Sequence, residues 1–362
     1  MSLDKKPLKI LIPVLAFSSA GGMRVLSKLA DRFIDMGHEV NFLGSQRINK
    51  PYYPTRARMK FFHNPLHQLP VVRGLFNLFF MFIYLVKNRR NYDVVLANYN
   101  LTAFPAAMAT LGTAKGFYYI QAYEPEFYSR NTFIGFFAYY ISTLSYYLPL
   151  YKIVNGGIYK KYKSVRATDV VEPGINLGQF IHKPKLRTGD IVEVGCIGRE
   201  LEWKGTSEII QAVSDVRART GFDLRLNVAF ELPKKIDASS FPFINLSLPH
   251  GDEKLAHFYR QSSLFIATGL LQDNAFHYPC LEAMASGCAV ITNYSPGNNT
   301  NAFYLSNVNT DKITKAILDY LDTDEVQLNA KIDRAQKDVL AYDWSVVAQK
   351  MILCFEKRLN LS

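Results

Sequence analysis

Two basic residues between two glycines form the pattern with the clearest chemical meaning in the sequence, Gly198-Arg199 followed by Lys204-Gly205. The apolar run 191–197 predicts a parallel strand that ends just before them, and a helix is predicted to begin near Thr206. Open α/β sheets bind ligands at the carboxyl ends of their strands, and a helix N-terminus attracts anions. We therefore predict a diphosphate site in which Arg199 and Lys204 neutralise the charge that grows on a departing diphosphate.

A second segment, 276–293, predicts a loop, a short helix over 280–286 and a strand over 289–292. Glu282 lies one turn into this helix, where its carboxylate can accept hydrogen bonds from both hydroxyls of a ribose. The backbone amides before Pro279 are expected to face a sugar and a phosphate. Gly287 permits a tight return into the strand. The expected ligand contacts in the loop are Phe276, His277 and Tyr278.

Each of these signals also has a plainer interpretation. Arg199 and Lys204 could be surface bases at a turn, and Glu282 an ordinary glutamate on a helix surface. Other sites lack support, because the sequence contains no GxxxxGK[ST], GxGxxG or HExxH motif. Asp322 and Asp324 have a DxD spacing but lie in a polar turn beside a helix, so we predict no metal site and no cofactor.

Apolar runs and amphipathic segments alternate along the chain and set these residues at the edges of sheets. Strands are predicted in the first half over 8–15, 39–43, 93–97 and 116–120, and in the second over 191–197, 224–230, 244–246, 264–267 and 289–292. The fold class is α/β, with two Rossmann-like domains facing each other across a cleft. We expect an N-terminal domain over 1–175, a polar linker around 173–174 and 182–190, and a nucleotide-binding domain over 176–345. A helix over 346–362 should pack back toward the first domain.

Three segments in this order resemble the retaining glycosyltransferases of family 4, which have the GT-B fold. They are 21–40 with Gly21-Gly22, 198–205 with Gly198-Arg199 and Lys204-Gly205, and 279–287 with Glu282. The resemblance implies that Gly21 and Gly22 approach donor and acceptor, and that Arg199 and Lys204 hold the diphosphate without a metal. It also implies that Glu282 holds the ribose. Asn274, with Asp273 beside it, stands where the family has the first glutamate of its E-x7-E motif, and Gln121 stands where it often has a histidine.

The segment 121–128 with Gln121 and Glu124, the His277-Tyr-Pro run, and 291–299 together resemble a bacterial subset that transfers rhamnose from dTDP-rhamnose. UDP-hexose is the open alternative. The resemblance implies a glycosyltransferase that extends a glycan or lipid-linked acceptor in cell-surface polysaccharide synthesis. Competing interpretations are a nucleotide-sugar epimerase or hydrolase of the same fold, and a non-catalytic protein that binds an anionic ligand.

The distribution of charged residues and the cysteines indicate where in the cell the protein acts. Residues 1–175 hold 22 basic and 9 acidic residues, and between Glu39 and Asp93 there are nine basic residues and no acidic one. This block suits an anionic partner, which could be a membrane surface, an anionic polymer or a nucleic acid, and its plainer interpretation is a solvated face. Of these we expect peripheral contact with an anionic membrane and no contact with nucleic acid. The apolar segment 75–86 and the aromatic-rich segment 133–151 could be buried or could face the membrane. Four scattered cysteines and an opening without an apolar run favour the cytoplasm over secretion.

Overall fold

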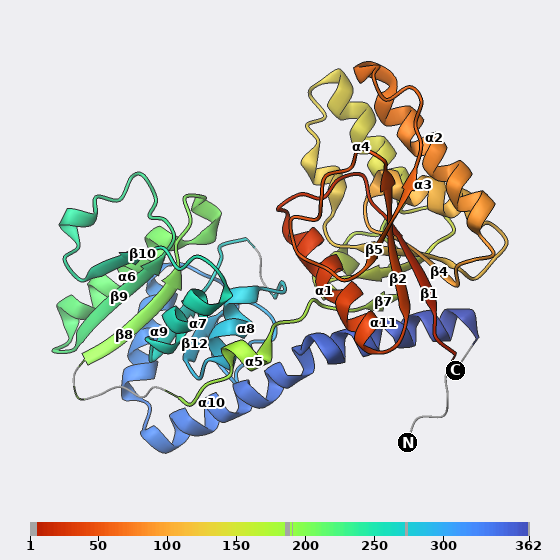
Figure 1. Cartoon of the computed structure of the whole chain (residues 1–362). Helices are drawn as coiled ribbons and strands as arrows, with labels where there is room; N and C mark the ends of the chain where they lie inside the picture. The colour runs from red at the N-terminus through yellow and green to blue at the C-terminus, as the bar shows by residue number, and fades with distance from the viewer. Residues whose placement is uncertain (1–5, 185–188, 190, 272–273, 361–362) are drawn as a thin grey trace. The chain divides into compact units, whose positions relative to one another are not determined.

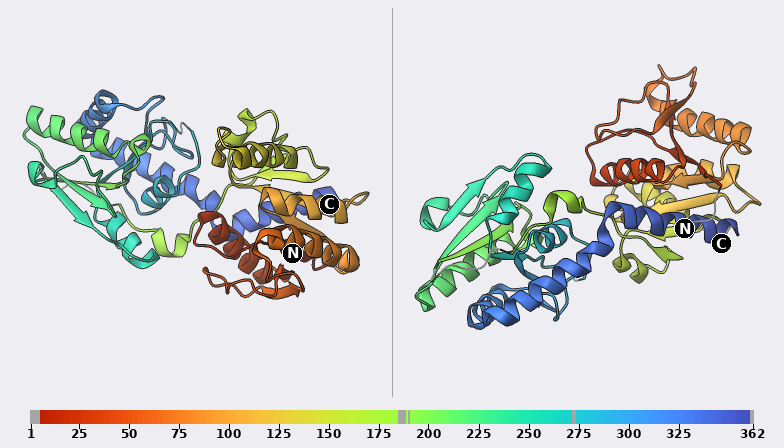
Figure 2. Two further views of the ribbon diagram at one scale, coloured as in Figure 1. Left: turned by 90° about the horizontal axis from the view of Figure 1, so that it is seen from above. Right: turned by 60° about the horizontal axis from the view of Figure 1, so that its bottom comes forward.

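The computed structural model describes residues 6–184, 189, 191–271 and 274–360 of the chain. It divides into two compact units. Unit 1 contains residues 1–174 and 344–362, and unit 2 contains residues 175–343. Figures 1 and 2 show the helices and strands of both units. Of the predicted linker 182–190, residues 185–188 and 190 lie outside the described residues, as does Asp273.

Unit 1 is built on a seven-stranded parallel sheet in the order β3-β2-β1-β4-β5-β6-β7. Its central strands β1, β4 and β5 are almost wholly buried, because helices cover both faces of a parallel sheet. The strands are β1 (Lys9–Pro13), β2 (Glu39–Ser45), β3 (Arg58–Phe62), β4 (Val94–Ala97), β5 (Gly116–Ile120), β6 (Tyr151–Val154) and β7 (Asp169–Val170).

Helices α1 (Gly21–Asp35) and α11 (Trp344–Leu359) share one hydrophobic core with the sheet of unit 1, although 308 residues separate them in the sequence. Phe355 of α11 packs edge to face against Phe33 of α1 and Phe117 of β5. A second core involves α2 (Pro70–Asn88), α3 (Asn100–Ala109) and the end of α4 (Phe133–Ser145), with Met81, Leu85 and Tyr146 among its buried residues. The last helix of the chain is thus part of the first unit.

Unit 2 repeats the plan with a six-stranded parallel sheet in the order β10-β9-β8-β11-β12-β13. Its strands are β8 (Ile191–Ile197), β9 (Asp223–Ala229), β10 (Ile244–Ser247), β11 (Leu264–Ala267), β12 (Ala289–Thr292) and β13 (Phe303–Tyr304). Its helices are α5 (Leu177–Phe180), α6 (Thr206–Arg219), α7 (Asp252–Arg260), α8 (Tyr278–Ala285), α9 (Thr310–Asp322) and α10 (Glu325–Val339). Two parallel Rossmann-like domains confirm the predicted fold class.

The strand order reverses once in each sheet, between β1 and β4 in unit 1 and between β8 and β11 in unit 2. At such a reversal the connections on the two sides lead away from each other, which leaves a crevice at the carboxyl ends of the strands. Residues that directly follow β1, β4, β8 and β11 are therefore placed where this architecture binds ligands.

Candidate functional site

The turn from β8 into α6 is closed by a compact set of hydrogen bonds. The amide of Gly198 donates to Ala229 O at 2.9 Å, and a Cβ at Gly198 would lie 1.9 Å from Glu231 O, so a side chain is excluded here. The amide of Arg199 donates to Thr206 Oγ1 at 3.0 Å, and that hydroxyl donates back to Arg199 O at 3.1 Å. These bonds fix Arg199 against the first residue of α6.

Both predicted cations of this turn are partly buried. The Arg199 guanidinium lies 5.2 Å from the centre of the Phe230 ring, and Lys204 Nζ lies 3.9 Å from that of Trp203. Burial lowers the pKa of Lys204 to about 8, and the nearby positive charge of Arg199 contributes to the shift. The two cations therefore act on each other in a partly desolvated place, unlike two independent surface bases.

His277, just before α8, lies beside the same two cations. Burial lowers its pKa to about 3, and the charges of Lys204 and Arg199 add to the effect. Its ring stacks on Tyr294, with centroids 3.9 Å apart and planes 16° apart. His277 Nδ1 is buried and has no hydrogen-bond partner among the described residues. A neutral imidazole next to two cations thus has one nitrogen that a ligand could engage.

Glu282 of α8 is only 3% exposed, so its interpretation as a helix-surface glutamate is wrong. Its Oε2 accepts a hydrogen bond from the Tyr259 hydroxyl of α7 at 2.9 Å. Tyr259 is fully buried, and its pKa is raised by burial and by the Glu282 carboxylate, against a lowering effect of Arg199. Glu282 and Arg199 are thereby placed near one buried tyrosine. Gly287 has φ +79°, as expected of the residue that ends the helix and returns to β12.

The loop between β11 and α8 is held by backbone contacts. Leu270 donates to Trp203 O at 2.8 Å, and the Asn293 side chain bonds both the amide and the carbonyl of Gly269. The amide of Asn274 donates to Asn293 O at 2.6 Å. The expectation that the loop amides face a ligand is thus wrong for Asn274 in this conformation, although its side chain is exposed.

Two of the other predicted loop residues pack on aromatic rings. Phe276 lies edge to face with Tyr278 at 5.1 Å and also contacts Tyr342. The charges of Arg199 and Lys204 both act on His277, and Arg199 and Glu282 both act on Tyr259, so the structure brings these four predicted site residues together.

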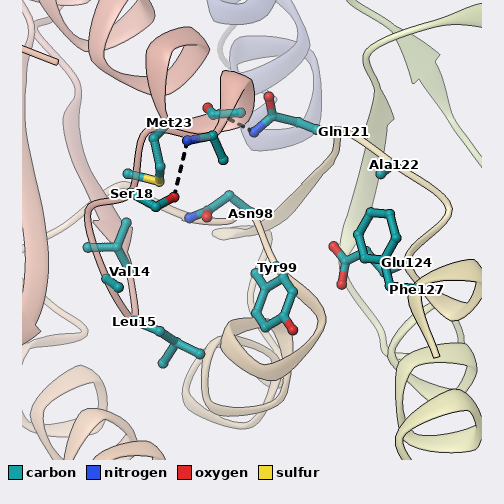
Figure 3. A pocket seen from close by; sticks show the side chains of 13 residues that line it. Val14, Leu15, Ser18, Met23, Asn98, Tyr99, Gln121, Ala122, Glu124 and Phe127 are labelled. Atoms are coloured by element: carbon teal, nitrogen blue, oxygen red, sulfur yellow. Dashed lines mark hydrogen bonds between the residues drawn. The ribbon is translucent and has the colours of Figure 1, made fainter. Parts of the chain in front are cut away.

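Unit 1 has a cavity of about 400 Å³ at its own strand reversal (Figure 3). Residues after β1, β4 and β5 line it, including Gly22, Asn98, Tyr99, Gln121, Glu124 and Phe127. Gln121 Nε2 donates to Gly22 O at 3.3 Å, and a Cβ at Gly22 would lie 3.2 Å from that nitrogen. Gly21 faces open space. Gln121, which directly follows β5, thus contacts the first turn of α1, where Gly21 and Gly22 lie.

Glu124 adds a buried carboxyl to this cavity that our sequence-based set of site residues did not include. Its Oε2 accepts the amide of Asn100, the first residue of α3, at 2.8 Å, and the Tyr118 hydroxyl donates to Oε1 at 3.4 Å. Burial raises the pKa of Glu124 to about 7, although these hydrogen bonds oppose the rise. Near neutral pH the carboxyl is thus divided between its two protonation states.

A family model described as glycosyl transferases group 1 matches residues 191–323, a region that contains Arg199, Lys204, His277 and Glu282. The chain is a glycosyltransferase with the GT-B fold. A search by sequence against curated proteins finds no significant match.

Solved structures similar to this glycosyltransferase share its fold at low sequence identity. A glycosyltransferase from Rickettsia africae superposes with a TM-score of 0.68 at 14% identity, over 99% of this chain and all of that one. HepE from Anabaena, crystallised with UDP and glucose, has a TM-score of 0.65 at 14% identity over 97% of this chain and all of HepE. The catalytic domain of starch synthase IV from Arabidopsis thaliana, bound to ADP and acarbose, has a TM-score of 0.64 at 13% identity over 98% and 100% of the two chains.

The DxD spacing at Asp322 and Asp324 has a structural explanation. Asp324 is the N-cap of α10, where its carboxylate accepts the amide of Gln327 at 2.9 Å. Within the described residues no group of three or more His, Cys, Asp or Glu side chains is placed to hold a metal ion. Within the same residues no helix combines the length and the apolar character needed to cross a membrane.

Proposed function

We propose that this glycosyltransferase takes its sugar from a nucleotide-diphosphate donor whose diphosphate binds at Arg199 and Lys204. The observation that carries the proposal is the pair of partly buried cations at the N-terminus of α6, beside the strand reversal of unit 2. Two like charges in a desolvated place repel each other, and an anion between them removes that repulsion. The same contacts stabilise the diphosphate as it leaves, without a metal ion.

The contacts to the rest of the donor are proposed from where the remaining site residues lie relative to Arg199 and Lys204. Glu282 binds the ribose, and His277 contributes the hydrogen-bonding capacity of Nδ1 close to the diphosphate. Rhamnose carried on dTDP is the first donor to test, because 121–128, the His277-Tyr-Pro run and 291–299 resemble rhamnosyltransferases, and UDP-hexose is the second. Transfer with retention of anomeric configuration follows from the resemblance of 21–40, 198–205 and 279–287 to family 4.

The acceptor is proposed to bind the cavity of unit 1, where Gln121, Gly22 and Glu124 supply polar groups and Phe127 an apolar one. A glycan or a lipid-linked sugar fits this mixture of an apolar wall and a few polar groups. The protein then acts on cell-surface polysaccharide at the cytoplasmic face of a membrane. Of the nine basic residues between Glu39 and Asp93, Arg56 pairs with Asp35 at 2.6 Å and is partly neutralised. The remaining eight support contact with anionic lipid.

A panel of dTDP-, UDP-, GDP- and ADP-sugars in a thermal-shift assay tests the donor, because a bound ligand raises the melting temperature by mass action. The expected result is stabilisation by one nucleotide class that is lost in Arg199→Ala/Lys204→Ala. Proton NMR of the product then gives the anomeric configuration, and an inverted product would overturn the proposed retention. Stabilisation that persists in the double variant would show that the diphosphate binds elsewhere.

A further inference from the structure

Helix α4 is built the reverse way to an ordinary surface helix. The residues it buries are small or polar, Gly135, Ser142 and Ser145. Its large apolar side chains point to solvent, with Phe133 80% and Ile134 81% exposed, and with between 43% and 55% exposed surface on Phe136, Phe137, Tyr140, Ile141 and Leu144. An amphipathic helix of a globular protein places its apolar stripe toward the core. In α4 that stripe faces outward.

The inner face of α4 shows that the orientation is specific. A Cβ at Gly135 would lie 2.0 Å from Ser129 O, so this position must be glycine for the helix to approach the preceding turn. Ser145 Oγ donates to Ser142 O at 2.7 Å inside the unit. Thr132 caps the helix by accepting the amide of Gly135 at 3.1 Å. Small residues on the inner face fit close packing, and a rotation of the helix would bring bulky rings into this tight space.

Most charged residues near α4 in the sequence are basic. From residue 127 to residue 168 the sequence has no acidic residue and six basic ones, Arg130, Lys152, Lys160, Lys161, Lys163 and Arg166, of which Lys152 is buried. The turn before this stretch carries the acidic Glu124, which is buried, and Glu126. Two of the basic residues contact aromatic rings in or next to the helix. The Arg130 guanidinium lies 5.1 Å from the ring of Tyr139, and that of Arg166 lies 4.8 Å from the ring of Tyr147. An apolar surface bordered by cations matches the boundary between lipid headgroups and acyl chains.

The apolar face is also next to the cavity of unit 1. The 3-10 turn η1 (Glu124–Phe127) packs against α4, and its two end residues line the cavity. Phe127 is 64% exposed at the rim. A sugar held in the cavity and attached to a lipid would have its lipid part close to α4.

We infer that α4 is the element of this protein that inserts into a membrane. Its exposed apolar face binds the interfacial region of a bilayer that contains anionic lipid. The inference rests on the proposed membrane contact and assigns it to a helix different from the basic segment 40–92. The exposed side chains Phe133 and Ile134 enter the acyl region, while Arg130 and Arg166 meet lipid phosphates. Helix α4 lies in the plane of the interface and does not span it, since its 13 residues are too few to cross a bilayer.

Vesicle binding of the full chain tests the inference. Co-sedimentation with phosphatidylglycerol/phosphatidylcholine vesicles and with pure phosphatidylcholine gives partition coefficients for wild type, for Phe133→Ser/Ile134→Ser and for a control, Val326→Ser/Leu353→Ser. The control removes apolar side chains that are 79% and 52% exposed on α10 and α11. We expect the α4 variant to lose at least about tenfold in partitioning into anionic vesicles, and the control to stay within about twofold, because two large side chains no longer leave water.

A reporter variant measures insertion directly. Trp at position 134 (Ile134→Trp) should be quenched by lipids brominated on the acyl chain, whereas Val326→Trp, at an equally exposed site, should not. Unaltered vesicle binding of the α4 variant, or no quenching at position 134, would overturn the inference. Self-association that depends on α4 without vesicle binding, seen in sedimentation velocity, would assign this face to a second copy and overturn it too. Thermal shift by the donor is expected to be the same in all these variants, which separates this test from that of the transferase function.

Discussion

The affinity for the donor diphosphate is expected to fall steeply above pH 8 because of Lys204. Burial and the charge of Arg199 lower the pKa of this lysine from 10.5 to about 8. A shift of this size corresponds to about 3 kcal/mol of penalty on the protonated form. A diphosphate favours the protonated form, so binding raises the pKa of Lys204 again. Below pH 8 the lysine is already charged, and above pH 8 each binding event must first take up a proton.

The magnitude follows from this linkage. The apparent dissociation constant should change little between pH 6.5 and 7.5, and should rise about tenfold from pH 7 to pH 9. Titration calorimetry with a nucleotide sugar measures it, since a diphosphate esterified at both ends does not itself titrate in this range. His277 stays neutral throughout, because its pKa is lowered to about 3. The rise is therefore assigned to Lys204.

Two variants make the assignment specific. Lys204→Arg keeps a positive charge up to pH 10 and should give a flat profile. Lys204→Met should bind weakly at every pH, also with a flat profile. The reasoning would be refuted by an equal rise in wild type and Lys204→Arg, or by a wild-type dissociation constant that is the same at pH 7 and pH 9.

Four further outcomes are expected. Arg199→Ala should lower turnover about 100-fold with an unchanged circular dichroism spectrum, since one contact to the leaving group is lost. Phe230→Leu should raise KM for the donor about threefold and Phe230→Tyr should not, because only the tyrosine keeps a ring beside Arg199. The two variants are matched for backbone strain, since the backbone at this position has a left-handed φ of +78° in both. Glu282→Gln should weaken nucleotide binding by about 1–3 kcal/mol in calorimetry, and a loss equal for nucleotide and free diphosphate would argue against ribose contact. Activity should survive EDTA dialysis, and its loss with recovery in Mg²⁺ would contradict transfer supported by side-chain cations alone.

The central strands could be predicted from the sequence because burial on both faces makes them continuous apolar runs. β5, β8, β11 and β12 were predicted with the bounds that the structure has. The edge strand β3 was not predicted, since Arg58 and Lys60 alternate with Met59 and Phe61, and the segment was interpreted by its charge. An edge strand covered on fewer sides tolerates such residues. β7 has only two residues and gives no periodic signal.

The sequence could likewise predict some features of the candidate site and not others. Arg199 and Lys204 could be placed from the sequence because they directly follow a predicted strand, and the same rule applied to Asn98 and Tyr99 after β4 would have found two more lining residues of the cavity. Long-range pairing could not be predicted. The hydrogen bond from Tyr259 of α7 to Glu282 of α8 joins residues 23 positions apart, and no periodicity shows which side chains of the two helices meet.

Lys204 in unit 2 and Glu124 in unit 1 are both ionisable groups whose charged form is disfavoured by burial, and the consequences are opposite in sign. Lys204 has a pKa near 8 and Glu124 a pKa near 7, so around neutral pH each changes its protonation state at little free-energy cost. An anionic donor favours the proton on Lys204. An acceptor hydroxyl that donates a hydrogen bond to Glu124 favours loss of its proton. The donor and acceptor binding that we propose would therefore couple to protons in opposite directions, and at a pH between 7 and 8 both ligands would find their partner in the required state.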